Sequence, residues 1–259
     1  MSSELDRLIE IVARLRGPDG CPWDREQTHA SLLQCLLDES YEFFEAVDEN
    51  APDKMKEELG DILLQVALHA QMGSEAGTFT IEEVARDINE KLIRRHPHVF
   101  GTVQVSSPEE VTGNWERIKQ TEKGKKHRTS LVDDIPEAMP ALFRAEKIQR
   151  RVARVGFDWK DAGPAMDKVE EEFREFREAT GENNHDHAAE ELGDILFALV
   201  NVARHRDICA EEALRAANKK FTRRFRYIEN ACKAAGMDIA KTSLEELDRF
   251  WEQSKKEVG

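Results

Sequence analysis

The seven-residue segment EELGDIL occurs twice in this chain of 259 residues, at Glu57–Leu63 and again at Glu190–Leu196. Each copy places a Glu and an Asp three positions apart beside a run of apolar residues. In an α-helix, residues three apart lie on one face. The repetition therefore indicates either a duplicated structural hairpin or a duplicated site.

The duplication extends well beyond this segment. EVARDINEKLIRR at 83–95 matches EALRAANKKFTRR at 212–224, and SPEEVTGNWERIK at 107–119 matches SLEELDRFWEQSK at 243–255. Four acidic positions also recur, each 133 positions later: Glu39, Glu42, Glu58 and Asp61 become Glu172, Glu175, Glu191 and Asp194. Because three blocks recur in the same order, we predict tandem homologous domains. They are residues 1–124 and 137–259, joined by a polar linker at 125–136.

The hydrophobic pattern of both repeats predicts helices. One buried stripe is expected from Leu59, Ile62, Leu63, Val66 and Ala70, and another on the preceding helix from Leu33, Leu36, Leu37, Phe44 and Val47. That preceding helix is expected to end near Asn50–Pro52, and Thr80 and Ser243 are expected to cap later helices. No strand pattern of useful length is present. The predicted fold class is all-α, with antiparallel helices arranged as in a bundle.

Composition narrows the possible functions. The 52 acidic residues outnumber the 38 basic ones, for a net charge of −14, which argues against broad nucleic-acid binding. No apolar run is long enough to span a membrane, and no signal-peptide core is seen, so a cytoplasmic location is expected. The four cysteines have neither zinc-site nor disulfide-framework spacing. They are Cys21, Cys35, Cys209 and Cys232.

The acidic quartet of the second repeat is expected to converge on one point. Glu172 and Glu175 share one helix face, and Glu191 and Asp194 share a face of the next, antiparallel helix. Both residues of the second pair are expected at the edge of an apolar stripe, and so at the rim of the seam between the helices; the stripe is formed by Leu192, Ile195, Leu196 and Leu199. Four converging carboxylates repel one another unless a cation neutralises them, and Mg²⁺ prefers oxygen ligands. A solvated acidic face explains one such pair well, but it explains the complete pattern, present twice, poorly.

These residues bear a resemblance to a known family. Glu171, Glu172 and Glu175, followed after fifteen residues by Glu191 and Asp194, resemble the EExxE…ExxD signature of the MazG nucleoside triphosphate pyrophosphohydrolases. The segments GCPWDREQT, RRHPHVF and VGFDW add to the resemblance, which covers nearly the whole chain and points to the two-repeat MazG proteins. It implies an all-α fold completed by dimerisation. It also implies hydrolysis of nucleoside triphosphates, ATP included, to the monophosphate and pyrophosphate, in nucleotide-pool housecleaning.

The resemblance also assigns roles. It implies that Glu172, Glu175, Glu191 and Asp194 hold Mg²⁺, for which Mn²⁺ could substitute. From the chemistry of the reaction, we expect Glu172 or Glu175 also to orient or deprotonate the attacking water. Lys220 and Arg224 are the implied catalytic contacts to the phosphates. The implied substrate-binding residues are Lys168, Glu171, Glu190, Asp194, Lys220, Arg223, Arg224, Trp251 and Lys255. Each auxiliary residue also has a plainer explanation: the basic ones can be a solvated helix face, and Trp251 can be core.

The two halves differ at positions that matter for this chemistry. The first repeat keeps its acidic quartet, Glu39, Glu42, Glu58 and Asp61, and so provides a second candidate metal site. However, Cys35 replaces Lys168, and Asp38 replaces Glu171. In the second repeat, His187 replaces Lys54, although a Lys is expected there. We therefore expect the C-terminal repeat to be the main catalytic domain, acting as a homodimer.

Two other readings remain open from sequence. A di-iron bundle needs Glu-x-x-His on inward-facing helices. The chain contains this motif only at Glu26/His29 and Glu182/His185, both in expected loops. The second alternative is a non-catalytic dimer that binds nucleotides as a regulator. The retention of carboxylates and basic residues in both repeats favours the enzyme, because a structural duplication requires only the apolar stripes.

Overall fold

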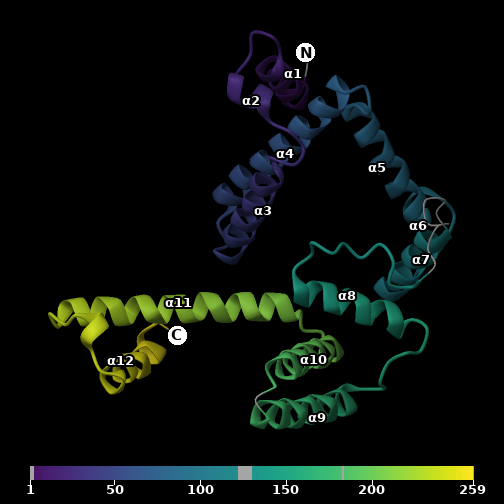
Figure 1. The fold of residues 1–259 in the computed structure, drawn as a ribbon. Coiled ribbons are helices and arrows are strands. Elements are labelled where there is room, and N and C mark those ends of the chain that lie inside the picture. Colours follow the sequence, from purple (N-terminus) through teal and green to yellow (C-terminus); the bar gives the residue numbers. More distant parts are fainter. Residues whose placement is uncertain (1–2, 122–129, 183, 259) are drawn as a thin grey trace. The chain divides into compact units, whose positions relative to one another are not determined.

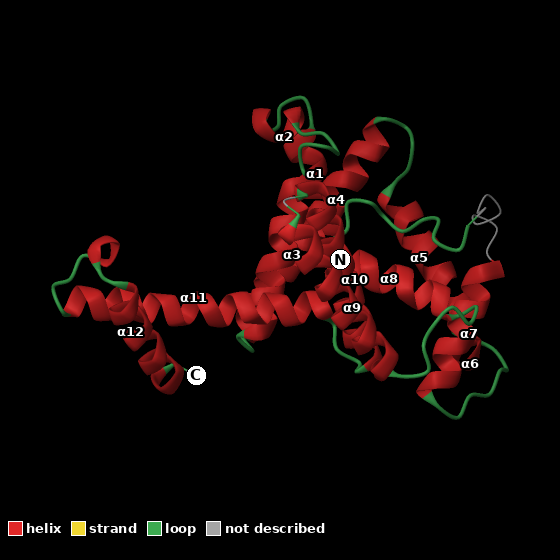
Figure 2. Cartoon of the chain, turned by 60° about the horizontal axis from the view of Figure 1, so that its bottom comes forward, coloured by secondary structure: helices red, strands yellow, loops and turns green. Residues whose placement is uncertain are grey.

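The structure, a computed structural model, describes residues 3–121, 130–182 and 184–258. Within these ranges every regular element is a helix (Figure 2), which confirms the predicted all-α class. The chain divides into two compact units, Met1–Lys125 and Lys126–Gly259. Of the predicted linker at 125–136, residues 125–129 lie outside the described residues, and the remainder precedes the first helix of the second unit.

Figure 1 labels the helices of the two units and colours them in chain order. The first unit contains α1 (Glu4–Arg16), α2 (Pro22–Glu26), α3 (Leu33–Asp48), α4 (Pro52–Glu75), α5 (Ile81–Arg95), α6 (Pro97–Phe100) and α7 (Pro108–Thr121). The second contains α8 (Ala141–Ala153), α9 (Ala162–Gly181), α10 (His185–His205), α11 (Ala210–Ala234), the 3-10 turn η2 (Ile239–Lys241) and α12 (Leu244–Glu257).

The same packing scheme is repeated in each unit. The pairs α3/α4 and α9/α10 form helical hairpins, α1 packs on α4 as α8 packs on α10, and α5 contacts α7 as α11 contacts α12. The predicted end of the first hairpin helix is confirmed, since α3 stops at Asp48 and α4 begins at Pro52. Pro at the first helical position costs no hydrogen bond and presets the backbone angle.

Side-chain caps fix where several helices begin. The hydroxyl of Thr80 accepts a hydrogen bond from the Glu83 backbone N–H, and the Glu83 carboxylate accepts one from the Thr80 backbone N–H, which completes the predicted capping box of α5. Ser243 accepts from the Glu246 N–H at the start of α12. Asp161 and Asn184 cap α9 and α10 in the same way. The caps at Asp161 and Asn184 fix where the two helices of the second hairpin begin, and this hairpin carries the acidic residues of the second repeat.

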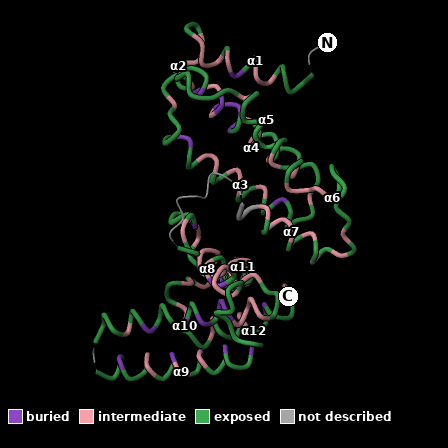
Figure 3. Tube along the Cα trace, turned by 90° about the vertical axis from the view of Figure 1, so that its right-hand side faces the viewer, coloured by how far each residue is buried: buried purple, intermediate pink, exposed green. Residues whose placement is uncertain are grey.

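The predicted apolar stripes are only partly buried, which is a correction to the sequence interpretation. Ala70 and Ile195 are buried as expected, but Leu63 and Leu196, at equivalent positions, are 41% and 46% exposed. The other exposed members of these stripes are Leu33, Leu37, Phe44, Val47, Leu59, Val66, Leu192 and Leu199. In Figure 3, buried positions along α9 and α10 are separated by exposed ones. A hairpin covers one face of each helix, so a wider stripe leaves a second face uncovered.

Candidate metal and nucleotide site

The hairpin of α9 and α10 brings three carboxylates together. One oxygen from each of Glu172, Glu175 and Glu191 lies within 4.8 Å of the other two. Glu172 and Glu191 are 5% and 7% exposed, and Glu175 is half-buried. Glu191 is therefore inside the seam between the helices, which corrects its expected place at the rim. We call Glu172, Glu175 and Glu191 the acidic trio.

The trio has a carboxylate oxygen without a partner. Oε2 of Glu191 is buried and accepts no hydrogen bond, while Oε1 lies 3.0 Å from Nε2 of His187, one turn earlier on α10. Burial raises the pKa of the Glu191 carboxyl, the nearby carboxylates of Glu172 and Glu175 add to the increase, and His187 opposes it. A buried acceptor that is left unpaired carries a desolvation cost.

The acidic trio fits a hard divalent cation. Oxygens bound at about 2.0–2.1 Å from Mg²⁺ lie at most roughly 4.2 Å apart, so small side-chain rotations suffice to close the trio around an ion. A cation would also give the buried, unpaired Glu191 oxygen a partner and would offset the repulsion between the three carboxylates. The donor set consists only of carboxylate oxygens, the ligands that Mg²⁺ and Mn²⁺ prefer.

Lys168 provides the positive charge beside the trio. Its Nζ lies 2.6 Å from Oε1 of Glu172 and 2.8 Å from Oε1 of Glu171. These hydrogen bonds, led by that to Glu171, raise the pKa of the Lys168 ammonium, and the same bond lowers the pKa of Glu171. The side chain is therefore a fixed cation at the edge of the carboxylates.

The two remaining acidic candidates of the second unit lie outside the trio. Asp194 is exposed one turn beyond Glu191 on α10, and its carboxylate is not one of the three that converge. Glu190 is also exposed, on the same face of α10 as Asp194. The spacing thus predicted the helix positions, while the side chains of the two exposed residues point into solvent.

A second group of candidates lies on α11 and α12. The guanidinium of Arg224 lies 5.6 Å from the centre of the Trp251 ring, and Phe221 packs on the same ring at 5.2 Å between centroids. Nε of Arg224 is buried without a hydrogen-bond partner. Lys220 and Arg223 are exposed on α11, and Lys255 pairs with Glu252 on α12. We call Lys220, Arg223, Arg224, Trp251 and Lys255 the basic–aromatic group.

In the part of the chain that the structure describes, the basic–aromatic group lies apart from the acidic trio. Among the described residues, no hydrogen bond or ion pair links Lys220 or Arg224 to Glu172, Glu175 or Glu191. In Figure 1, α8 and α10 lie near the beginning of α11, whereas α12 packs on its later part. The predicted catalytic residues therefore form two clusters within one copy of the second unit.

The first unit contains a related acidic cluster. Carboxylate oxygens of Glu39, Glu58 and Asp61 converge within 4.8 Å, whereas Glu42 is exposed outside this group. The pKa of the Glu39 carboxyl is raised, mainly by burial and to a lesser extent by the charges of Asp61 and Glu42. When the two repeats are aligned at their separation of 133 residues, each of the four positions of the acidic quartet belongs to at least one of the two clusters. Arg95 over Trp115, at 5.1 Å from the ring centre, repeats the contact of Arg224 with Trp251.

The departures of the first repeat have a structural basis. Cys35, which replaces Lys168, is half-buried and packs against a hydrophobic core of Val12, Leu32 and Leu68. It therefore supplies no charge beside Glu39. Lys54, which corresponds to His187, pairs with Glu49 at 2.7 Å. The first cluster thus lacks the fixed cation that Lys168 provides in the second.

The histidines do not assemble a di-iron site in the described part of the chain. His29 lies 2.7 Å from His69, between Nδ1 atoms, rather than beside a group of carboxylates. His185 is 3.9 Å from Asp186 at an exposed helix start. The two convergent metal-ligand groups found among the described residues contain only carboxylates. This arrangement disfavours the di-iron alternative.

Sequence reasoning missed two features of the second unit. One is the contact of His187 with Glu191. The sequence showed that His187 stands where a Lys was expected, but it gave this residue no role. The other is a cavity between α8, α10 and the segment before α9, lined by Gln149, Asp158, Asn201 and Arg204 among others. The only sequence signal for the cavity is the VGFDW segment, Val155–Trp159, which had served as a family marker alone.

Comparison with known proteins places these observations in a family. The MazG nucleotide pyrophosphohydrolase domain matches the chain over residues 27–100 and 164–228. The chain is 47% identical over 250 residues to the nucleoside triphosphate pyrophosphohydrolase/pyrophosphatase MazG of Thermotoga maritima, covering 96% of this chain and 95% of that protein. It is 45% identical over 258 residues to a nucleoside triphosphate pyrophosphohydrolase of Escherichia coli K12, covering 98% of each.

A third relative is a longer protein. The uncharacterized protein YabN of Bacillus subtilis is 50% identical over 254 residues, covering 98% of this chain and 52% of that protein. Both stretches that match the MazG domain contain one acidic hairpin each, α3/α4 and α9/α10. The chain belongs to the MazG nucleotide pyrophosphohydrolase family and contains its domain twice.

Proposed function

We propose that this chain hydrolyses nucleoside triphosphates, ATP among them, to the monophosphate and pyrophosphate, with the second repeat as the main catalytic domain. The observation that carries the proposal is the unpaired, buried Oε2 of Glu191 inside the acidic trio, because such an oxygen calls for a cation. The two relatives that match almost the full chain bear the name nucleoside triphosphate pyrophosphohydrolase, which supports the same reaction.

The acidic trio would hold Mg²⁺, or Mn²⁺ in its place, and Asp194 would join it by rotating its exposed side chain. A bound divalent ion would supply charge neutralisation at the phosphate oxygens and polarise a water molecule. Glu172 and Glu175 lie on the α9 side of the trio, where either carboxylate can accept a hydrogen bond from the attacking water and orient it. Glu172 is the more buried of the two, and both carboxylates remain candidates for this role.

The cationic side chains would bind the phosphate oxygens. Lys168 is already beside Glu172 and can turn its ammonium group towards a phosphate. Arg224 offers a planar donor set with one buried nitrogen unpaired, which suits bidentate phosphate binding. Lys220 and Arg223 add charge on the same helix, and Trp251 and Lys255 border it on α12. Glu171 and Glu190 flank the trio as further substrate contacts.

A second copy of the chain would complete this site. The acidic trio and the basic–aromatic group are separate within one copy, and the hairpin leaves Phe173, Leu192, Leu196 and Leu199 exposed. Contiguous exposed apolar faces mark protein contacts. In a two-fold dimer, the face of one hairpin packs on the same face of its partner, which makes a four-helix arrangement. The proposed active form is therefore a homodimer, acting on the cytoplasmic nucleotide pool in its housecleaning.

Product analysis tests the reaction. The purified protein is incubated with each NTP and dNTP plus Mg²⁺, and pyrophosphate and orthophosphate are measured separately. We expect stoichiometric monophosphate and pyrophosphate, lost on addition of EDTA and restored by Mg²⁺ or Mn²⁺. Orthophosphate with a diphosphate product would identify cleavage of a different bond and contradict the proposal.

Matched variants locate the reaction within the chain. Glu172→Gln removes one charge from the second cluster, and Glu39→Gln makes the equivalent change in the first. The proposal requires the first variant to lose most of the turnover and the second to keep most of it. Tight nucleotide binding without pyrophosphate release by the unmodified protein would instead support the non-catalytic regulatory dimer.

A further inference from the structure

We propose that the cavity between α8, α10 and the Val155–Trp159 segment binds the base of the nucleotide, with the side-chain oxygen of Gln149 accepting a hydrogen bond from an amino or imino N–H on the edge of the base. This inference rests on the proposed function, since it names the part of the site that recognises which nucleotide is hydrolysed. It lies entirely within the second unit and concerns residues outside the acidic trio and the basic–aromatic group.

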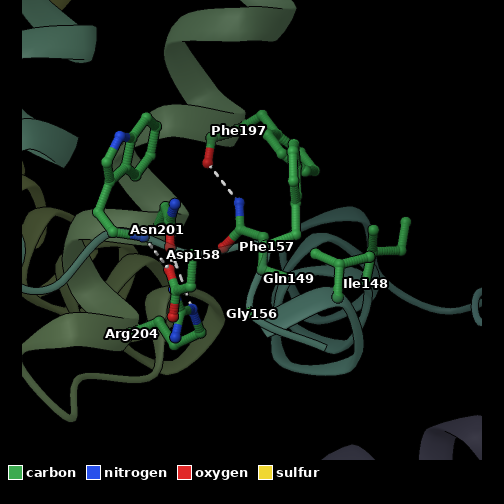
Figure 4. Close-up of a pocket in the computed structure, with 10 residues that line it drawn as sticks. Ile148, Gln149, Gly156, Phe157, Asp158, Phe197, Asn201 and Arg204 are labelled. Carbon is green, nitrogen blue, oxygen red and sulfur yellow. Dashed lines mark hydrogen bonds and ion pairs between the residues drawn. The ribbon is translucent and has the colours of Figure 1, made fainter. Parts of the chain in front are cut away.

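The cavity has the size and lining of a ligand pocket. Its volume is about 430 Å³, within the range of roughly 300–1,000 Å³ that is usual for small-molecule sites. Apolar and aromatic side chains make up most of the wall, and a few polar groups converge on it (Figure 4). The lining residues on which the argument depends are Gln149, Phe157, Asp158, Trp159, Asn201 and Arg204.

Gln149 carries an acceptor that the protein itself does not use. Its side chain is 4% exposed, and its Nε2 donates to the backbone carbonyl of Phe197 over 2.8 Å. Its Oε1 is buried without a hydrogen-bond partner. In Figure 4 this oxygen points towards the side of the pocket where Asp158 and Asn201 lie. Because the amide nitrogen is held by Phe197, the free oxygen can only accept, so it selects a donor on the ligand.

The opposite side of the pocket is held rigid by an ion pair. Arg204 lies 2.5 Å from Oδ1 of Asp158, and the same carboxylate oxygen lies 3.1 Å from Nε2 of His205. Arg204 also donates to Oδ1 of Asn201 over 2.5 Å. These contacts fix the segment that carries Phe157 and Trp159, two aromatic side chains with exposed surface at the cavity. Aromatic side chains provide flat surfaces on which every base can stack.

Comparison of the two repeats shows that the second has polar groups where the first has a core. Gln149 is the ninth residue of α8, and Val12 is the ninth residue of the equally long α1. Asn201 corresponds to Leu68 at the 133-residue separation of the acidic positions. Val12 and Leu68 are buried together in the hydrophobic core of the first unit. A structural duplication would retain this apolar pair, so the two buried amides at these places, beside the cavity, indicate a function for the second repeat that the first does not share at the same positions.

The cavity is also placed correctly with respect to the acidic residues. On α10, Glu190, Asp194, Phe197, Asn201 and Arg204 succeed one another at alternating spacings of four and three, so they share one face. Asn201 is seven positions beyond Asp194, which corresponds to about 10 Å along the helix axis. That separation is comparable with the length of a nucleoside. Phosphates at the acidic end would therefore place the base at the cavity.

The decisive variant restores the residues of the first repeat. In Gln149→Val/Asn201→Leu the pocket acquires the apolar pair that the first unit packs stably. We measure kcat and KM for the full NTP and dNTP panel, together with inhibition by inorganic tripolyphosphate, which has phosphates but no base. The expected result is a rise of about tenfold in KM for the preferred nucleotide and loss of base preference. Inhibition by tripolyphosphate is expected to remain as in the unmodified protein.

A milder variant and an analogue guard against damage to the fold. Gln149→Met keeps the length of the side chain and removes the acceptor, and its secondary structure is checked by circular dichroism. For the unmodified protein, the preferred nucleotide is compared with its analogue that lacks the exocyclic amine. If Gln149 contacts the edge of the base, the unmodified protein should have a higher KM for the analogue than for the preferred nucleotide. In Gln149→Met, the KM values for the two nucleotides should be similar.

The outcomes separate this inference from the proposed function. If no nucleotide is hydrolysed but calorimetric affinity for the nucleotide falls in the double variant, the reaction is wrong and the base pocket stands. Unchanged KM and base preference in both variants would overturn the base pocket while leaving the hydrolysis intact. An altered oligomeric state with unchanged KM would overturn it as well, because the cavity would then belong to a contact between subunits.

Discussion

The ammonium group of Lys168 lies 2.6 Å from Oε1 of Glu172, one turn further along α9. In the first repeat the same place is taken by Cys35, which packs against the core and leaves Glu39 without a cation beside it. The two acidic clusters therefore differ in a charge next to their equivalent glutamates.

The first prediction concerns Lys168 itself. Lys168→Cys gives the second repeat the residue of the first and removes the charge that we propose binds phosphate. We expect KM for the Mg²⁺–nucleotide complex to rise about tenfold, because a charge-assisted hydrogen bond is lost. Steady-state kinetics measure this effect, and Lys168→Arg, which keeps the charge, is the control. Equal activity of the Cys variant and the unmodified protein would remove Lys168 from the substrate site.

The second prediction compares the two clusters. Glu172→Gln is expected to lower kcat/KM by at least roughly 100-fold, since removing a proposed direct metal ligand should cost more than changing a residue that supports one. Glu39→Gln, at the equivalent place in the first unit, is expected to stay within about twofold of the unmodified protein, because we propose that the second cluster carries most of the turnover. Comparable losses in both variants would show that the repeats share the catalysis.

The third prediction uses stability rather than activity. In the absence of metal, Glu191→Gln should raise the melting temperature, because it removes one of three mutually repelling carboxylates from a buried place. The same variant should lose the stabilisation by Mn²⁺, which for an intact site is about 2.7 kcal/mol at an ion concentration 100 times Kd. Differential scanning fluorimetry with and without Mn²⁺ measures both effects. Glu178→Gln, an exposed change on α9 outside the trio, is the control and should alter neither.

Much of the acidic cluster could be predicted from sequence because it depends on local geometry. Residues three apart on a helix share a face whatever surrounds them, so Glu172 and Glu175 were expected together and are found together. Which carboxylates turn inwards is a different matter, because it depends on side-chain rotations. The second cluster uses Glu175 and leaves Asp194 exposed, whereas the first uses Asp61 and leaves Glu42 exposed.

Burial could not be predicted from periodicity alone. The stripe containing Leu192 and Leu196 was expected to be buried, yet both side chains are nearly half-exposed, because burial depends on which faces find a partner. The cavity was missed for a related reason. Gln149 lies in a helix with many charged residues, and nothing in its sequence neighbourhood distinguishes it from a solvated position. Only the packing of α8 on α10 buries it.

The fourth prediction concerns the ion pair at the wall of the cavity. Burial alone would raise the pKa of Asp158, but the hydrogen bond and charge of Arg204, with help from His205, outweigh it and lower the pKa. A carboxyl with a lowered pKa in the folded state stabilises the protein at pH values above its pKa in the unfolded chain, about 3.9. That contribution is lost as the pH falls from there through the folded-state pKa.

Urea unfolding of Asp158→Asn tests this dependence. At pH 7 the variant should be less stable than the unmodified protein by about 1.5–3 kcal/mol, the usual range for a hydrogen bond to a charged group. The difference should shrink as the pH is lowered below about 3.9. Asp167→Asn, an exposed change on α9, serves as the control. A stability difference that is constant with pH would show that the charge of Asp158 is not what stabilises the contact.

The fifth prediction concerns the exposed face of the second hairpin. If Leu192, Leu196 and Leu199 pack against a second copy, Leu196→Glu places a charge in that contact and should shift the protein from dimer to monomer. Because the proposed site takes its basic–aromatic group from the partner, turnover should fall together with the dimer. Light scattering coupled to gel filtration measures the mass, and the pyrophosphate assay measures turnover. The control is Leu244→Glu: Leu244 is 77% exposed at the start of α12, where an acidic side chain favours the helix. A Leu196→Glu variant that remains a fully active dimer would show that the dimer, if formed, uses a different face.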